Sequence, residues 1–499
     1  MPPPERPLIV FVHGWGATST RSYGGLPDAV LAQIRAGRID ADIAHLWLGR
    51  YVSFRDEVRM DDLARGFDAA LAELLAEAGP GRRVACIAHS TGGVVVREWL
   101  ARYYPTPADR ARCALGHLVM LAPPNAGSAL AQLGQSRLAG LRAWFGGVEP
   151  GRCLLDWLEL GSDASYRLAH GWITGPHAAG DGPPFQFVLC GDAIDRRLYD
   201  HVNAYTGEIG SDGVVRLAAA HLDAHYLQLR QPPAADAASA RTQRAVALQE
   251  QARHRSQGAA FRILPRVAHS GSAMGIMASV VPPGDDHPTV AALLRCLAVR
   301  DTVAYAELAR AFAAENAVHQ APELRLEIQR VPVLRDREFI HDPHSMLVLR
   351  LFDDTGLPVE DVDVLLTGAG SPDRLPRGFM TDRQGNRLAP NVVTFYLNHA
   401  VLGGAPPVPR PDGSLARAAA AARRPYGLLV RPRAGGRFVE YRAASTAASF
   451  DLLDALAPNQ TTWIDIVLHR VVRRGVFRLA RPGAAPADFR RVAPGEAID

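Results

Sequence analysis

The chain of 499 residues contains no lysine, because its 55 basic residues are all arginine. Without a lysine amine it cannot form a Schiff base through lysine or hold a phosphate with a P-loop lysine, so both classes of mechanism are excluded. An excess of charge of one sign is also lacking, since the formal net charge is only +4. Nothing in this charge indicates a nucleic-acid partner.

Cysteines and long apolar runs are scarce. The five cysteines are odd in number, lie in apolar contexts and form no C-x-x-C pair, which predicts reduced core residues and neither a disulfide framework nor a zinc site. No apolar run approaches membrane-spanning length, and residues 1–7 lack the apolar core of a signal peptide. We therefore expect a cytoplasmic protein, unless it is exported by a route that needs no cleaved signal.

The length predicts more than one domain. Strand and helix patterns alternate through residues 1–320, which predicts a mostly parallel, doubly wound sheet. From residue 321 to 499 strand patterns alone are separated by turn clusters, which predicts an antiparallel, sandwich-like all-β domain. Within the first domain, residues 231–258 are rich in Ala, Gln, Arg and Pro, and we expect a loop or a solvated helix there.

An apolar strand pattern that breaks at Ser90 and resumes with helical spacing predicts a strand, a tight turn and a helix over residues 83–100. Such a turn strains the serine backbone and needs small neighbours, which Ala88 and Gly92 provide. Ser90 Oγ would stand at the carboxyl end of the strand, and the amide of Thr91 would point at an oxyanion there. The pattern therefore predicts a serine nucleophile.

The segment Ala88-His89-Ser90-Thr91-Gly92 resembles the nucleophile elbow of α/β hydrolases, in the alanine-first variant of some bacterial lipases. Near the N-terminus an apolar run ends in His13-Gly14-Trp15-Gly16, which resembles the HG-x-G loop of lipases. The resemblance implies the α/β-hydrolase fold. It also implies that the backbone amide of Trp15 is a second oxyanion donor beside that of Thr91.

A serine nucleophile needs a histidine base, which in turn needs an acid to orient it. The segment Gly210-Ser211-Asp212-Gly213-Val214-Val215 resembles the one that carries the acid in bacterial lipases, and His269 lies in a short loop after a predicted strand. The order Ser90, Asp212, His269 is that of α/β hydrolases and implies nucleophile, orienting acid and general base. The alternatives that stay open are Asp192 and Asp195 for the acid and His221, His225 and His287 for the base.

Residues 129–184 form an insertion with several apolar side chains, at a point where many lipases carry a lid or cap. An apolar lid face would contact an acyl chain, or the same side chains would only pack the insertion onto the domain. The candidates for acyl contact are Trp144, Phe145 and Trp157.

The expected reaction is hydrolysis of a carboxylic ester of an acyl lipid through an acyl-enzyme, with no cofactor and no metal, since no dense carboxylate loop is present. The expected partners are a lipid or other acyl-ester substrate and, transiently, a membrane surface, while the oligomeric state stays open. Three other interpretations remain: an acyltransferase with the same triad, an antibacterial phospholipase effector, and a lipid-binding scaffold without activity.

Overall fold

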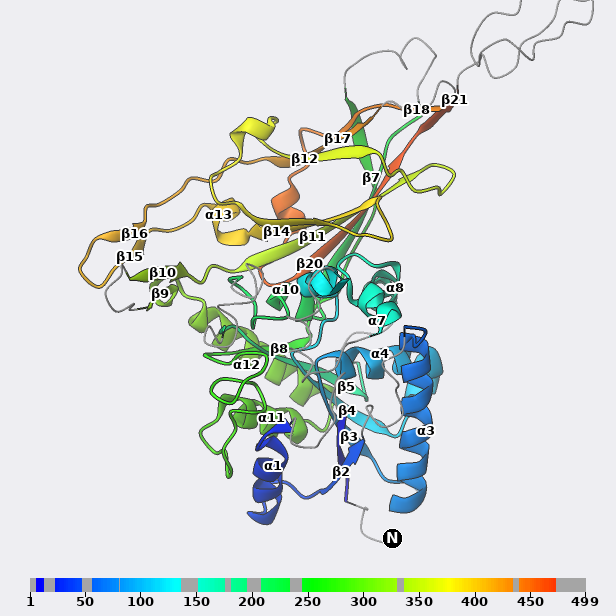
Figure 1. The fold of residues 1–499 in the computed structure, drawn as a ribbon, viewed down its shortest axis with the longest axis vertical. Coiled ribbons are helices and arrows are strands. Elements are labelled where there is room, and N and C mark those ends of the chain that lie inside the picture. The colour runs from blue at the N-terminus through cyan, green and yellow to red at the C-terminus, as the bar shows by residue number, and fades with distance from the viewer. Residues whose placement is uncertain are drawn as a thin grey trace, which may run out of the picture.

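Two β-sheets organise the molecule, a parallel sheet in the lower half of Figure 1 and a mixed sheet in the upper half. The structure is a computed structural model. It describes residues 6–12, 23–46, 56–79, 81–135, 151–175, 181–194, 208–233, 245–329, 336–433 and 439–472.

The lower sheet has six strands in the order β2-β1-β3-β4-β5-β8, and every neighbouring pair is parallel. Its central strands are continuous apolar runs because helices cover both faces. The sheet confirms the predicted doubly wound architecture. The strands are β1 (Leu8–Val12), β2 (Asp42–Leu46), β3 (Val84–His89), β4 (Leu115–Leu121), β5 (Phe185–Gly191) and β8 (Ala260–Leu264).

Helices flank this sheet on its two faces, with α3 and α4 on one side and α1, α11 and α12 on the other (Figure 1). Four of them turn an apolar stripe inward, as an amphipathic helix packed on a sheet does, whereas residues 91–97 of α4 are all buried. These helices are α1 (Leu26–Arg35), α3 (Met60–Ala78), α4 (Thr91–Tyr103), α11 (Pro288–Ala298) and α12 (Thr302–His319).

The upper sheet has nine strands in the order β12-β17-β19-β7-β6-β20-β11-β14-β13. It is mixed, not antiparallel as expected, because β20 pairs in parallel with both β11 and β6, and β19 pairs in parallel with β7. The strands are β6 (Ala224–Arg230), β7 (Val246–Arg255), β11 (His344–Asp353), β12 (Val362–Gly368), β13 (Met380–Gly385), β14 (Val392–Asn398), β17 (Tyr426–Pro432), β19 (Ala444–Thr446) and β20 (Thr461–Leu468).

Two of these strands, β6 and β7, come from the segment before residue 321. A boundary near residue 320 therefore does not separate the two sheets, and residues 246–255 are a strand where we expected a loop or a solvated helix. The polar sequence of β7 hides it, since most of its side chains face solvent and only Leu248 is buried. Its backbone hydrogen bonds with β6 and β19 nevertheless make it part of the ladder.

The strands of the upper sheet alternate between two hydrophobic cores. On β11, Met346 and Val348 belong to the core that begins in the parallel sheet, whereas Leu347 and Leu349 belong to a second core inside the upper sheet. This is the period of two that a strand buried on both faces requires. The first core thus runs without interruption from the parallel sheet to the underside of the mixed sheet.

The described part of the insertion lies between the two sheets as α7 (Arg152–Leu158) and α8 (Asp163–Thr174) (Figure 1). Gly161 between them has a φ of +74°, and a Cβ there would lie 2.6 Å from Cγ1 of Val392 on β14. Asn386 Nδ2 donates to the carbonyl oxygen of Leu160 over 3.0 Å, and the amide of Arg387 donates to Glu159 Oε1 over 2.7 Å. The turn between β13 and β14 therefore holds the insertion against the upper sheet.

Together with 3-10 turns such as Ala129–Gln135, shorter helices and strands connect these elements. They are α5 (Pro107–Ala111), α10 (Leu217–Ala220), α13 (His399–Gly403), β9 (Leu326–Gln329), β10 (Arg337–Ile340), β15 (Val408–Pro409), β16 (Leu415–Arg417), β18 (Val439–Tyr441) and β21 (Arg470–Val472). Residues 473–499 of the predicted all-β domain lie outside the described residues. Among the residues that are described, no helix is both long and apolar enough to cross a membrane.

Candidate active site

Ser90 occupies the tight turn between β3 and α4 with a φ of 53° and a ψ of −127°. Residues other than glycine rarely adopt a positive φ, so the surrounding structure must impose it. The amide of Ser90 donates to the carbonyl of Leu121 over 2.8 Å, and its own carbonyl accepts from the amide of Gly93 over 3.0 Å. A Cβ at Gly93 would lie 3.0 Å from Met120 Cγ, so glycine lets α4 start close to β4. These contacts fix the Ser90 side chain at the carboxyl end of β3.

The structure brings Ser90, His269 and Asp212 together from three separate loops. His269 Nε2 lies 3.2 Å from Ser90 Oγ, and His269 Nδ1 lies 2.9 Å from Asp212 Oδ2. The carboxylate can only accept, so Nδ1 carries the proton and Nε2 is left to accept from the serine hydroxyl. This is the tautomer that a general base facing Ser90 requires.

Asp212 is completely buried and accepts four hydrogen bonds on its carboxylate, one of them a long bond from Cys190 Sγ to Oδ2 over 3.8 Å. Besides His269, the amides of Val214 and Val215 donate to Oδ1 over 3.0 and 2.8 Å. The backbone amide of His269 donates to the Asp212 carbonyl over 2.9 Å, which ties the two loops together. A buried carboxylate with these donors stays where it can orient the imidazole.

The loop that carries Asp212 is held by residues that the sequence analysis did not find. Arg216 is buried and donates to both carboxylate oxygens of Glu208 over 2.7 and 2.8 Å, and it also contacts Asp382 on β13. Tyr396 on β14 donates through its hydroxyl to the Gly210 carbonyl over 2.9 Å. The upper sheet thus anchors both ends of this loop, through contacts that no local pattern in the sequence signals.

Of the two alternative acids, the structure describes Asp192. Asp192 Oδ2 lies 2.5 Å from Nε2 of His319 on α12, so it is engaged with a different histidine. Asp195 lies outside the described residues.

The alternative bases have other structural partners. His221 Nδ1 accepts from the amide of Asp223 over 2.9 Å, and burial lowers the pKa of its imidazole to about 3. His225 lies on β6, where burial lowers its pKa to about 4. His287 caps the N-terminus of α11 by accepting from the amide of Thr289 over 3.2 Å.

Of the two predicted oxyanion donors, the structure describes one. Thr91 is the first residue of α4, so its amide belongs to the end of the helix that favours negative charge. Trp15 lies outside the described residues, and its role stays a prediction.

A cavity of about 80 Å³ opens beside Ser90 and His269. Its apolar wall comes from three segments: Leu158 of the insertion, Pro124 after β4, and Val214 with Val215 beside the acid. An apolar wall next to a nucleophile suits an acyl chain.

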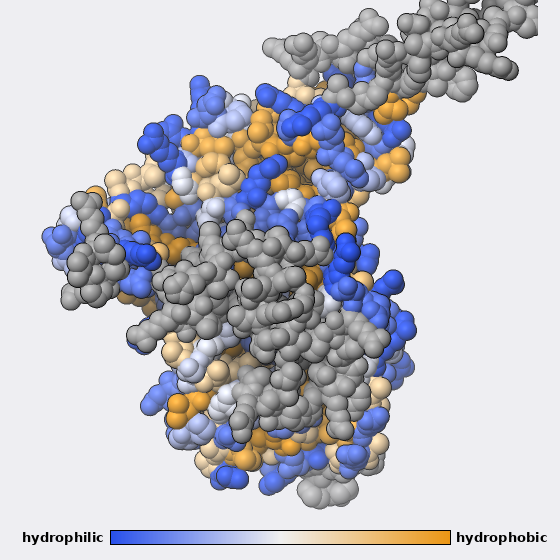
Figure 2. Space-filling model, viewed as in Figure 1, coloured by the Kyte–Doolittle hydropathy of each residue, from blue (hydrophilic) through white to orange (hydrophobic). Residues whose placement is uncertain are grey.

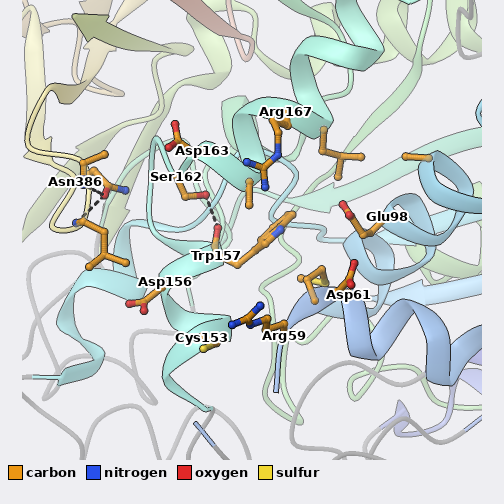
Figure 3. Close-up of a pocket in the computed structure, with 16 residues that line it drawn as sticks. Arg59, Asp61, Glu98, Cys153, Asp156, Trp157, Ser162, Asp163, Arg167 and Asn386 are labelled. Atoms are coloured by element: carbon orange, nitrogen blue, oxygen red, sulfur yellow. Dashed lines mark hydrogen bonds between the residues drawn. The ribbon is translucent and has the colours of Figure 1, made fainter. Parts of the chain in front are cut away.

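A larger cavity of about 600 Å³ contains none of the triad residues. Trp157 lies across its centre between Arg167 and Arg59 (Figure 3). The structure therefore places Trp157 in the wall of this second cavity, while its neighbour Leu158 lines the one at Ser90. The smaller cavity is the one that Ser90 and His269 line. Trp144 and Phe145 lie outside the described residues.

Within the described ranges no group of three His, Cys, Asp or Glu side chains is arranged to hold a metal ion.

The comparison with solved structures places the chain in a family. Phospholipase PlaB from Legionella pneumophila matches with 36% sequence identity and a TM-score of 0.83, over 96% of this chain and 97% of that enzyme. This chain belongs to the PlaB family. It is a lipase- and phospholipase-like α/β-hydrolase, as the elbow and lipase-like motifs implied.

A second structure of PlaB, in complex with thio-NAD, matches with 36% identity and a TM-score of 0.82 over the same shares of both chains. The mature lipase BlEst2 from Bacillus licheniformis matches with 20% identity and a TM-score of 0.30, over 44% of this chain and 81% of that lipase. Comparison with protein-family models and with curated proteins gave no match.

Proposed function

We propose that this protein hydrolyses carboxylic esters of acyl lipids, phospholipids among them, with Ser90 as nucleophile, His269 as general base and Asp212 as orienting acid. The observation that carries the proposal is the continuous hydrogen-bond relay from Ser90 Oγ through His269 to Asp212 Oδ2. Membership of the PlaB family supports the lipid-ester class of substrate.

In this reaction Ser90 Oγ attacks the ester carbonyl carbon while its proton moves to His269 Nε2. Asp212 accepts from Nδ1 and stabilises the imidazolium that forms. The amide of Thr91 donates to the oxyanion of the tetrahedral intermediate. The His269 proton then moves to the leaving alcohol, and a water molecule activated by the same imidazole hydrolyses the acyl-enzyme and releases the fatty acid.

The acyl chain would lie against Leu158, Val214 and Val215, the apolar wall of the cavity at Ser90. Burying methylene groups there supplies binding free energy of about 0.8 kcal/mol per CH₂. Longer chains should therefore bind better until the wall ends.

We also propose transient contact with a lipid surface, since the substrate resides there. Figure 2 shows apolar residues gathered over the upper sheet on the face in view.

The five cysteines are free and four of them are buried, which suits synthesis in a reducing cytoplasm.

The test is hydrolysis of p-nitrophenyl esters of increasing chain length and of phosphatidylcholine by wild type and Ser90→Ala. We expect kcat to fall by about 10⁴-fold or more in the variant. A fluorophosphonate should label wild type and Ser279→Ala but not Ser90→Ala. Wild-type activity in Ser90→Ala would refute the mechanism. A wild type that the fluorophosphonate labels but that cleaves no lipid ester would refute the substrate class.

A further inference from the structure

Arg97 is a buried cation without a carboxylate partner. It projects from α4, two turns beyond Ser90, and its side chain is 5% exposed. The guanidinium donates one hydrogen bond, from Nη1 to Asn125 Oδ1 over 2.9 Å, and its Cζ lies 5.6 Å from the centre of the Trp172 ring. Burial lowers the pKa of Arg97 to about 10, because neither contact supplies the negative charge that a buried guanidinium needs.

The side chain borders a small space between α4, α8 and β20. Its volume is about 10 Å³, which is room for about one water molecule. Trp172 of α8 and Trp463 of β20 line the same space, and the indole N–H groups of both are buried without an acceptor in the described structure. Among the described residues that line it there is no Asp or Glu.

The remaining polar groups of this space are donors or are already engaged. His221 accepts on Nδ1 from the amide of Asp223, so its neutral ring has its proton on Nε2. Thr461 uses its hydroxyl hydrogen to donate to the Ala218 carbonyl, and Asn125 Oδ1 is occupied by Arg97. The space is therefore surrounded by a fixed positive charge and unpaired N–H donors.

We propose that this space is a binding site for one small monovalent anion of the halide class, with chloride as its ligand in solution. A halide accepts hydrogen bonds from any direction, so it can serve the Arg97 guanidinium and both indoles at once. A phosphate or carboxylate is too large for a cavity of this volume. A neutral water would fit but would leave the guanidinium with no counter-ion in contact, since Glu98 acts on it only from a distance.

The bound anion joins three parts of the molecule. Arg97 belongs to the helix that starts at the nucleophile, Trp172 to the insertion and Trp463 to the upper sheet. Asn125, whose Nδ2 donates to the Ala220 carbonyl over 2.6 Å, extends the contact to the helix after the acid loop. Chloride should thus stabilise the packing of the upper sheet on the catalytic domain.

Diffraction tests the site directly. Crystals of the full chain soaked in sodium bromide, measured at the bromine edge, should show an anomalous peak within hydrogen-bond distance of the Arg97 guanidinium and Trp463 Nε1. Bromide peaks only on the outer surface, with a water or nothing beside Arg97, would overturn the proposal.

Thermal unfolding tests it in solution. With sodium chloride replacing sodium gluconate at constant ionic strength, we expect Tm of the wild type to rise by about 2–4 °C and then saturate. Arg97→Gln should lose this rise. Arg102→Gln, on the same helix but partly exposed beside Asp61, should keep it.

If Arg97→Gln does not fold, Trp172→Phe removes one donor and should raise the chloride concentration of half effect several-fold. A wild type whose Tm is the same in both salts, or an equal chloride response in all variants, would overturn the proposal.

Discussion

Ser90 has a backbone conformation that glycine adopts without strain and other residues do not. Its φ of 53° is imposed by its hydrogen bonds to Leu121 and Gly93. We expect Ser90→Gly to be more stable than Ser90→Ala by about 1–2 kcal/mol, because alanine keeps the strain and glycine relieves it. Urea denaturation of the two inactive variants measures the difference.

A matched pair of variants at Ser279 provides the control. The φ of Ser279 lies outside the left-handed region, so Ser279→Gly should be less stable than Ser279→Ala. If the glycine variant is the more stable one at both positions, the difference at Ser90 does not come from backbone strain.

The acid is the second residue whose role can be tested by itself. Asp212→Asn should lower kcat by about 10³–10⁴-fold, because an amide in place of the carboxylate favours the wrong histidine tautomer. Asp192→Asn should leave kcat close to wild type, since Asp192 contacts His319 at the end of α12. If ester hydrolysis is lost in Asp192→Asn and kept in Asp212→Asn, Asp192 is the acid.

At the level of elements, the upper sheet positions the acid loop of the lower domain. The Tyr396 hydroxyl donates to the Gly210 carbonyl. A Cβ at Gly210 would lie 2.5 Å from the hydroxyl oxygen of Tyr396, so only glycine fits there. Tyr396→Phe removes this donor and leaves the amide of Leu217 as the donor to the Gly210 carbonyl, so the loop loses its tie to the upper sheet at this point. We expect kcat to fall about ten-fold with KM little changed, because the loop that orients His269 loosens while the acyl wall stays.

The control for this variant is Tyr426→Phe. Tyr426 also lies in the upper sheet and donates to a backbone carbonyl, that of Leu402, over 3.0 Å, but it contacts nothing near the triad. Steady-state kinetics on one p-nitrophenyl ester measures both variants. An equal loss of kcat in the two would mean that the upper sheet acts through general stability and not through the acid loop.

Local patterns were sufficient to predict some elements and insufficient for others. The elbow at Ser90 and the parallel strands around it were predictable, because an apolar run, a small-residue turn and a helical period are local signals. β7 was not, because its side chains are polar and only pairing with β6 and β19 makes it a strand. The contacts of Arg216 with Asp382 and of Tyr396 with Gly210 were missed because the partners are distant in sequence.

At the level of the whole molecule, the two sheets form one folding unit. Met346, Val348, Tyr396 and Trp463 of the upper sheet belong to the same core as the strands of the lower sheet. The chain also crosses between the sheets three times, from β5 to β6, from β7 back to β8, and from β8 to β11. Separating the sheets would expose this shared core to water, so we expect them to unfold together.

His344 lies at this junction and makes the stability depend on pH. It is 3% exposed, its Nδ1 donates to the Asp342 carbonyl over 2.8 Å, and its Nε2 accepts from the Thr381 hydroxyl over 2.9 Å. Its ring stacks on that of Tyr396 with centroids 4.6 Å apart. Burial lowers the pKa of His344 to about 4, so the folded protein holds it neutral.

The unfolded chain binds a proton at this histidine near pH 6.5 and the folded chain only near pH 4. The contribution of His344 to stability is therefore full above pH 6.5 and is lost as the pH falls toward 4, by at most about 3 kcal/mol. We expect the free energy of unfolding to decline over this range in the wild type and to decline less in His344→Gln. His254→Gln, at an exposed position on β7, should follow the wild type. Urea denaturation at intervals between pH 7.5 and 4 measures the three slopes, and an equal slope in His344→Gln and wild type would show that this junction does not sense the proton.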